Sequence, residues 1–230
     1  NIGGGLKVTG TTNILSKLSV AGCVAFGMSI ASGSQSRALG YQSTASGDYS
    51  VAMGNNTTAS ESVATALGYS TRASGVYSTA MGNSTTASGH SSTAMGMSTS
   101  ASGNNSTAMG SYSKASGVNS TAIGQQASAT GSDSFAVGYR ATASDLHSVA
   151  IGYRATASGQ YSHALGYYTS ASGDYSRAMG RNTLASGEYS VAMGSYTKAS
   201  GSGSTAMGRN TAASGDYSTA MGRNTVASEE

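Results

Sequence analysis

The sequence is short of the residues that usually fill or lock a globular core. Its 230 residues include no Pro, no Trp, 2 Phe and 1 Cys. A single cysteine excludes a disulfide framework within the chain, and Cys23 lies in an apolar stretch where we expect a buried free thiol. The apolar fraction of 38% is carried mainly by Ala and Met, so large core-filling side chains are scarce.

Charge and long apolar runs are also scarce, which narrows the function classes. Only 9% of residues are charged, the net charge is +3 and no basic run is present, so nucleic-acid binding has little support. No apolar run is long enough to span a bilayer, so we expect no membrane insertion. No signal peptide is visible, and the chain starts without Met and stops just inside a repeat, so we expect a fragment of a longer protein.

A repeat of fourteen residues is the main feature that is present. A glycine preceded by Ala and an apolar residue recurs from Gly40 to Gly222, in fourteen copies without insertion or deletion. A degenerate copy precedes them at Gly27, one residue out of step. Abundant Gly and Ser would fit a disordered linker, but a linker has no reason to keep such a register. The sequence therefore predicts a repeat architecture.

The pattern inside each repeat has period two, which indicates short strands and not helices. In one copy, Ser106, Ala108 and Gly110 share one face, and Thr107 and Met109 share the other. Fourteen extended residues reach at most about 46 Å. Two strands of about five residues then leave room only for tight turns, where we expect glycine to supply positive φ. We predict an all-β solenoid of flat 14-residue coils, with Ala, Ser and Gly between two close sheets.

The residue before each repeat glycine is always apolar and lies on the face opposite the Ala and Ser. We call this set the methionine column; it comprises Leu39, Met53, Leu67, Met81, Met95, Met109, Ile123, Val137, Ile151, Leu165, Met179, Met193, Met207 and Met221. As an exposed stripe it would far exceed the few hundred Å² of contiguous apolar surface that monomers tolerate. We therefore predict that the column is the interface of a cyclic assembly, and that the isolated chain is not stably folded.

Short motifs within the repeat resemble a known family. Ser50–Gly54 and Ser190–Gly194 read Ser-Val-Ala-Met-Gly, Ser148–Gly152 reads Ser-Val-Ala-Ile-Gly, and an Ala-Ser pair follows each. This pattern resembles the head repeat of trimeric autotransporter adhesins, the YadA-like head, over nearly 90% of the chain. The resemblance implies a left-handed parallel β-roll, a homotrimer and a role in attachment at an extracellular surface.

Some residues depart from the family pattern. Met dominates the methionine column, where family members favour Ile. The glycine after Ala-Ser is replaced by Glu61, Asp145 and Glu229, and the serine of Ala-Ser is replaced once, by Thr130. We expect these changes to loosen single turns without disturbing the register.

The N-terminal segment differs from the repeats. Residues Leu6–Gly22 contain alternating stretches broken at Gly10 and Gly22, and they resemble shaft or neck segments of phage and viral fibre proteins. We divide the chain into a β neck or shaft segment, residues 1–26, and a β-roll head, residues 27–230, with fourteen regular repeats and one degenerate repeat. The segment keeps a virion surface open as the location, beside a cell surface.

The residue patterns do not predict catalysis. His90, His147 and His163 occupy different positions of the repeat, so they cannot stack into a metal-ligand set. No His and acid converge on one serine at a regular spacing, and the glycine-rich calcium-binding nonapeptide is absent. We therefore expect a protein that is not an enzyme and has no cofactor and no metal.

The outward columns are the remaining candidates for binding. Tyr161, Tyr175 and Tyr189 recur at one position of the repeat, and arginines that include Arg181 and Arg209 cluster late in the chain. We take these five residues as a candidate ligand surface for a host surface protein or glycan. The competing interpretation is cross-coil stacking and solvated charge pairs with no ligand.

Three functions follow from this organisation. The leading hypothesis is an adhesive fibre, in which repeated weak contacts on a stiff trimer give avidity. The alternative is a purely structural virion or phage fibre component. An ice-binding solenoid is suggested by threonine columns such as Thr79 and Thr93, but Arg37, Phe135 and His163 interrupt that column and would spoil a flat regular face.

Overall fold

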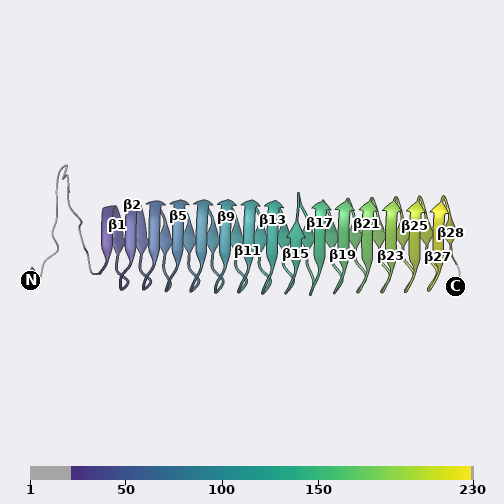
Figure 1. Cartoon of the computed structure of the whole chain (residues 1–230), viewed down its shortest axis with the longest axis horizontal. Helices are drawn as coiled ribbons and strands as arrows, with labels where there is room; N and C mark the ends of the chain where they lie inside the picture. The colour runs from purple at the N-terminus through teal and green to yellow at the C-terminus, as the bar shows by residue number, and fades with distance from the viewer. Residues whose placement is uncertain (1–21, 229–230) are drawn as a thin grey trace, which may run out of the picture.

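The chain forms a rod of stacked coils, each built from two strands and two turns (Figure 1). A computed structural model describes residues 22–228. Within this range all 28 elements are strands, and each pairs in parallel with the equivalent strand one coil away. The prediction of an all-β parallel solenoid with about 14 residues per coil is confirmed. Its left-handed sense stays an implication of the resemblance.

Each coil has one long strand that carries the repeat glycine. In the first two coils the long and short strands are continuous, as β1 (Val24–Ala31) and β2 (Arg37–Ala45). The later long strands are β3 (Val51–Asn55), β5 (Thr65–Tyr69), β7 (Thr79–Asn83), β9 (Thr93–Met97), β11 (Thr107–Ser111), β13 (Thr121–Gln125), β15 (Phe135–Val137), β17 (Val149–Tyr153), β19 (His163–Tyr167), β21 (Arg177–Arg181), β23 (Val191–Ser195), β25 (Thr205–Arg209) and β27 (Thr219–Arg223).

The second strand of each later coil is shorter than the five residues we expected. It has two residues, because the chain then enters a four-residue turn closed by a backbone hydrogen bond, such as Ser120 N–H to the Gly117 carbonyl at 3.3 Å. The short strands are β4 (Thr58–Ala59), β6 (Arg72–Ala73), β8 (Thr86–Ala87), β10 (Ser100–Ala101), β12 (Lys114–Ala115), β14 (Ser128–Ala129), β16 (Thr142–Ala143), β18 (Thr156–Ala157), β20 (Ser170–Ala171), β22 (Leu184–Ala185), β24 (Lys198–Ala199), β26 (Ala212–Ala213) and β28 (Val226–Ala227).

The register between coils follows the sequence repeat. Gly110 pairs with Gly124, and the degenerate Gly27 pairs with Gly40. The missing residue of the first copy appears as a register shift between Met28 and Ile30. The coils with Glu61 and Asp145 keep their pairing, as we expected.

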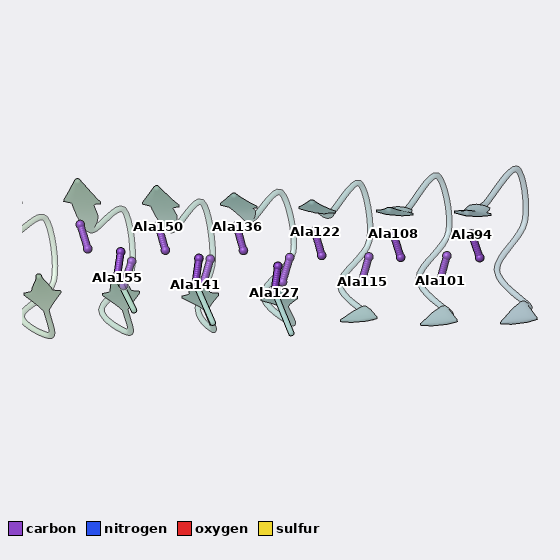
Figure 2. Close-up of a cluster of buried hydrophobic side chains, with 14 of the residues drawn as sticks. Ala94, Ala101, Ala108, Ala115, Ala122, Ala127, Ala136, Ala141, Ala150 and Ala155 are labelled. Atoms are coloured by element: carbon purple, nitrogen blue, oxygen red, sulfur yellow. The ribbon is translucent and has the colours of Figure 1, made fainter. Parts of the chain in front are cut away.

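The interior between the two sheets holds only small side chains. Ala108 on the long strand and Ala115 on the short strand are fully buried, and the equivalent alanines of neighbouring coils point toward one another across the roll (Figure 2). Buried Ser and Thr hydroxyls complete the interior, and the largest fully buried side chain is Thr. Each alanine methyl contributes only about 0.8 kcal/mol on burial. One chain therefore has little apolar core, and its coils are joined by a regular set of backbone hydrogen bonds.

Glycine does not supply the left-handed turn positions, which corrects our expectation. Two residues per coil have φ near +55°, and nearly all are larger residues, such as Tyr112 and Tyr161. From Tyr49 onward, each of these residues donates its N–H to a carbonyl of the preceding coil, as Tyr112 does to Met97 at 2.8 Å. These inter-coil bonds hold side-chain-bearing residues in a conformation that they otherwise rarely adopt.

The recurrent glycines have a different role, which is close stacking of the backbone. Gly110 lies within β11 at φ +120°, and a Cβ there would overlap the carbonyl oxygen of Gly124. Gly117 has no positive φ, yet a Cβ there would overlap the carbonyl oxygen of Gly131. Glycine thus allows one coil to lie directly against the next, both in the long strand and in the turn.

Cys23 is exposed, so the expected buried thiol is wrong. It precedes β1, which pairs with one strand only among the described residues, so the apolar stretch around it is not covered by a second coil. Its Sγ donates a hydrogen bond to the Gly33 carbonyl at 2.8 Å.

The predicted fibre-shaft segment lies almost wholly outside the described residues. The division at residue 26 therefore stays a prediction, although β1 already begins at Val24. Among residues 22–228 no helix has the length and apolar character needed to cross a membrane.

Candidate functional site

The coil offers four surfaces, because residues fourteen apart stack into columns. The long-strand face carries the methionine column, and the short-strand face lies opposite. We define the loop edge as the three turn residues before each buried serine or its equivalent, such as Gly159–Tyr161. We define the turn edge as the two residues after each repeat glycine, such as Tyr167–Tyr168. Every long strand runs from the loop edge to the turn edge (Figure 1).

The methionine column lies outside the roll. None of its members is buried: Met53, Ile151 and Met221 are 42%, 39% and 58% exposed, and the others are half-buried by their neighbours in the column. The ladder is continuous, with Met81 paired to Met95 and Met95 to Met109. The surface is therefore a long apolar strip, and its role as an interface stays a prediction.

The three predicted tyrosines form a ladder on the loop edge. The rings of Tyr161 and Tyr175 lie 5.0 Å apart at 1°, and those of Tyr175 and Tyr189 lie 4.9 Å apart at 11°. His147 extends the ladder by stacking on Tyr161 at 4.8 Å. All four are exposed, and backbone hydrogen bonds fix their spacing. The result is a rigid aromatic strip along the rod.

The two predicted arginines lie elsewhere in the chain's cross-section. Arg181 and Arg209 are the last residues of β21 and β25, on the turn edge, whereas the tyrosines precede the long strands. The guanidinium of Arg181 lies 5.6 Å from the ring centre of Tyr196, which also belongs to the turn edge. A single chain therefore does not bring the five residues of the candidate ligand surface together.

A second aromatic ladder, on the turn edge, was missed from the sequence. Tyr139, Tyr153 and Tyr167 stack at 4.9 and 5.0 Å, with ring planes 16° and 14° apart. Their spacing of fourteen, one residue after each repeat glycine, was the signal that could have revealed them. Tyr139 at one end of the ladder follows β15, which has three residues, whereas the other long strands from β3 to β27 have five.

Arginines flank this second ladder. Arg154 lies 5.8 Å from the ring centre of Tyr153 and 5.3 Å from that of Tyr168, and its Nη1 donates to the Tyr168 hydroxyl at 2.9 Å. Desolvation by the neighbouring groups raises the pKa of Tyr153, Tyr168 raises it further, and Arg154 acts in the opposite direction. The turn edge is thus basic and aromatic.

Charges are fully separated around the cross-section of the described chain. All seven carboxylates of residues 22–228 lie on the loop edge: Asp48, Glu61, Asp133, Asp145, Asp174, Glu188 and Asp216. None of the ten Lys and Arg side chains in this range lies there, and five of them lie on the turn edge: Arg140, Arg154, Arg181, Arg209 and Arg223. One edge is therefore acidic and the other basic.

Several loop-edge carboxylates also tie successive coils together. Asp174 Oδ1 accepts the N–H of Gln160 at 2.9 Å, and Asp216 Oδ1 accepts that of Ser202 at 2.8 Å. Each carboxylate keeps a second oxygen for another partner.

The histidines do not come together. His147 belongs to the loop-edge ladder, His90 packs edge-to-face on Tyr77 at 5.6 Å, and His163 lies on the long-strand face. Burial lowers the pKa of His163, and the positive charge of Arg177 in the next strand lowers it further. In the part of the chain that the structure describes, no group of three His, Cys, Asp or Glu side chains is placed to hold a metal ion.

A parallel solenoid with small interior residues and an apolar strip outside defines the chain as a β-solenoid repeat protein. The family model of the YadA head domain repeat (2 copies) matches residues 31–57, 59–85, 87–113, 115–141, 129–155, 143–169, 157–183, 171–197 and 199–225. The chain belongs to this family. A search of the curated proteins finds no match.

Membership of this family indicates a general class of function. YadA heads are the surface-exposed, adhesin-type and non-enzymatic heads of trimeric autotransporter adhesins. The resemblance predicted from the repeat motif is confirmed. The match gives no support to the alternative location on a virion.

Proposed function

We propose that this chain is the non-enzymatic head of a homotrimeric surface fibre that attaches a cell to host or matrix ligands. The observation that supports this function best is the methionine column, an apolar ladder that runs along the outside of the roll. A strip of this length needs a partner that repeats at the same spacing, and another copy of the chain has that property.

The energetics favour such an assembly. Full burial of a Met, Leu, Ile or Val side chain contributes about 1.5–3 kcal/mol. The column offers fourteen partly exposed residues of this kind, whereas the interior of one chain holds only Ala, Ser, Thr and Gly. The interface therefore supplies the large apolar contacts that the roll lacks.

The trimer has a simple geometry. The strands run across the rod, perpendicular to its long axis (Figure 1). Three rods side by side, with the long-strand faces turned inward, form a triangular prism with the methionine columns toward its axis. The family's trimeric adhesins are consistent with three chains.

The tyrosine ladder of the loop edge is the ligand surface we favour. Tyr161, Tyr175 and Tyr189 present stacked rings at about 5 Å intervals, held rigid by the coil. Rigid aromatic side chains give contact area at little cost in conformational entropy. Three such ladders on one fibre would bind a glycan or protein surface with avidity.

Binding by the native trimer tests this function. We expect trimers captured on a sensor to bind at least one member of a panel of host glycans and matrix proteins. Tyr175→Ser should weaken that binding by about tenfold or more, because a stacked aromatic contact is worth about 0.5–1.5 kcal/mol and is repeated in each chain. Tyr217→Ser is the matched control, since Tyr217 occupies the same column and stacks on no other ring among the described residues.

The outcomes separate the alternatives. An intact trimer that binds no panel member would favour the purely structural fibre. Equal losses in both tyrosine variants would show that the ladder is not the ligand surface.

A further inference from the structure

The two charged edges of the roll fit each other, and we propose that they meet between chains. In the trimer, the turn edge of one chain lies against the loop edge of the next, so that arginines of one copy pair with carboxylates of its neighbour. This proposal rests on the homotrimer proposed above and defines how its chains join.

The direction of the strands leads to this arrangement. All long strands run across the rod from the loop edge to the turn edge (Figure 1). A threefold axis parallel to the rod makes the three long-strand faces the sides of a triangle. Around that triangle the end of each side meets the start of the next, so every corner brings a turn edge to a loop edge. Such a head-to-tail contact closes into a ring.

The charges on these edges are complementary. The loop edge carries all seven described carboxylates, and the turn edge carries five arginines and no carboxylate. A five-residue strand, about 16 Å long, separates the edges within one chain, so the two sets cannot pair there. Among residues 22–228 the loop-edge aspartates accept hydrogen bonds from backbone N–H groups and from the Asn119 amide. The next chain places opposite charges side by side.

The charges also match in height along the rod. In four coils a carboxylate lies in the loop before the long strand and an arginine lies in the turn edge after it. These pairs are Asp133 with Arg140, Asp145 with Arg154, Asp174 with Arg181, and Asp216 with Arg223. A threefold axis puts equivalent residues at equal height, so each pair is level across the corner. Between residues 62 and 132 neither edge is charged.

The groups have the hydrogen-bonding capacity that this contact needs. Asp174 uses Oδ1 for the Gln160 N–H and has a second oxygen to accept from a guanidinium. Arg181 is placed by its contact with the Tyr196 ring at 5.6 Å. In a partly desolvated corner such a charge-assisted pair is stronger than on an open surface. The same contact would bring Arg181 beside Tyr175 of the neighbouring chain, which unites the candidate ligand surface across two chains.

Cross-linking of paired cysteines tests the arrangement. In a Cys23→Ser background, Arg181→Cys and Asp174→Cys are combined in one chain, and the native particle is treated with a short bis-maleimide. We expect covalent trimers on a denaturing gel, because each chain is linked to the next around the ring. The two single variants are the controls and should remain monomers, since each lacks the partner thiol.

Other patterns overturn the proposal. Linked dimers from Arg181→Cys alone would mean that two turn edges meet, and no linkage in a particle of trimer mass would mean that the edges stay apart. The mass of the same untreated sample is measured by light scattering. A mass other than a multiple of three chains would count against the homotrimer itself.

Charge exchange provides a second measurement that needs no cross-linker. Arg181→Asp and Asp174→Arg should each lower the melting temperature of the trimer, and the double exchange should restore most of the loss. Arg72→Asp, on the short-strand face, should have a smaller effect. If the double variant loses as much melting temperature as the two single variants together, the proposed pairing is wrong.

Discussion

At the scale of single residues, the small side chains set the distance between coils. Gly110 in β11 lies so close to Gly124 that a Cβ would overlap the carbonyl of the next coil. Ala108 and Ala115 fill the narrow space between the sheets without separating them.

Gly110→Ala tests this role of the repeat glycines. We expect it to destabilise the fold by more than about 3 kcal/mol, since it combines left-handed backbone strain with a steric overlap. Gly222→Ala is the control: Gly222 has a similar φ of +110°, but its nearest atom to an added Cβ is Thr225 Cγ2 at 3.8 Å. Thermal unfolding of both variants measures the difference. If both variants lose the same stability, backbone strain at positive φ alone explains why glycine is needed at this position.

At the scale of the strand, outward side chains of neighbouring coils stack in columns and change each other's electrostatic environment. His163 begins β19 on the long-strand face, between Val149 and Arg177 of the adjacent strands. Burial and then Arg177 hold its pKa below the usual value of about 6.5. The folded chain therefore resists protonation of this ring more than the unfolded chain does.

This linkage predicts loss of stability in acid. Below about pH 6.5 the unfolded chain binds a proton that the folded chain still excludes, so the free energy of unfolding falls as the pH falls toward the lowered folded-state pKa of His163. We expect the melting temperature of the native protein to drop more between about pH 7.5 and about pH 5 than that of His163→Gln. Parallel curves for the two proteins would show that His163 has no such effect.

At the scale of the whole molecule, one roll leaves its largest apolar side chains outside. The methionine column is partly exposed along its length, and the interior of the roll has no side chain larger than Thr among those that are fully buried. Assembly is therefore expected to be coupled to folding.

Met81→Lys tests the column as the interface. A lysine in the centre of an apolar trimer axis would be desolvated, so we expect loss of the trimer mass in sedimentation and a large fall in melting temperature. Thr86→Lys is the matched control in the same coil, because its column on the short-strand face already contains Arg72 and Lys114. A trimer that tolerates both lysines equally would exclude the methionine column from the interface.

The sequence by itself determined the repeat, the short strands, the alanines inside and the methionine column outside. These features depend on alternation and spacing along the chain, which are local properties. The family followed for the same reason, because its motif lies within one repeat.

Only the tertiary structure decided where each coil turns. These turns determine the backbone conformation, the strand lengths and the edge on which each side chain lies. The tertiary structure placed Tyr112 and Tyr161 at positive φ, shortened the second strand to two residues and left Cys23 exposed. It also put Arg181 and Tyr175 on opposite edges, although they are only a few residues apart in sequence. The physical reason is that the width and direction of a coil are fixed by hydrogen bonds to the coils beside it, which no pattern within one repeat contains.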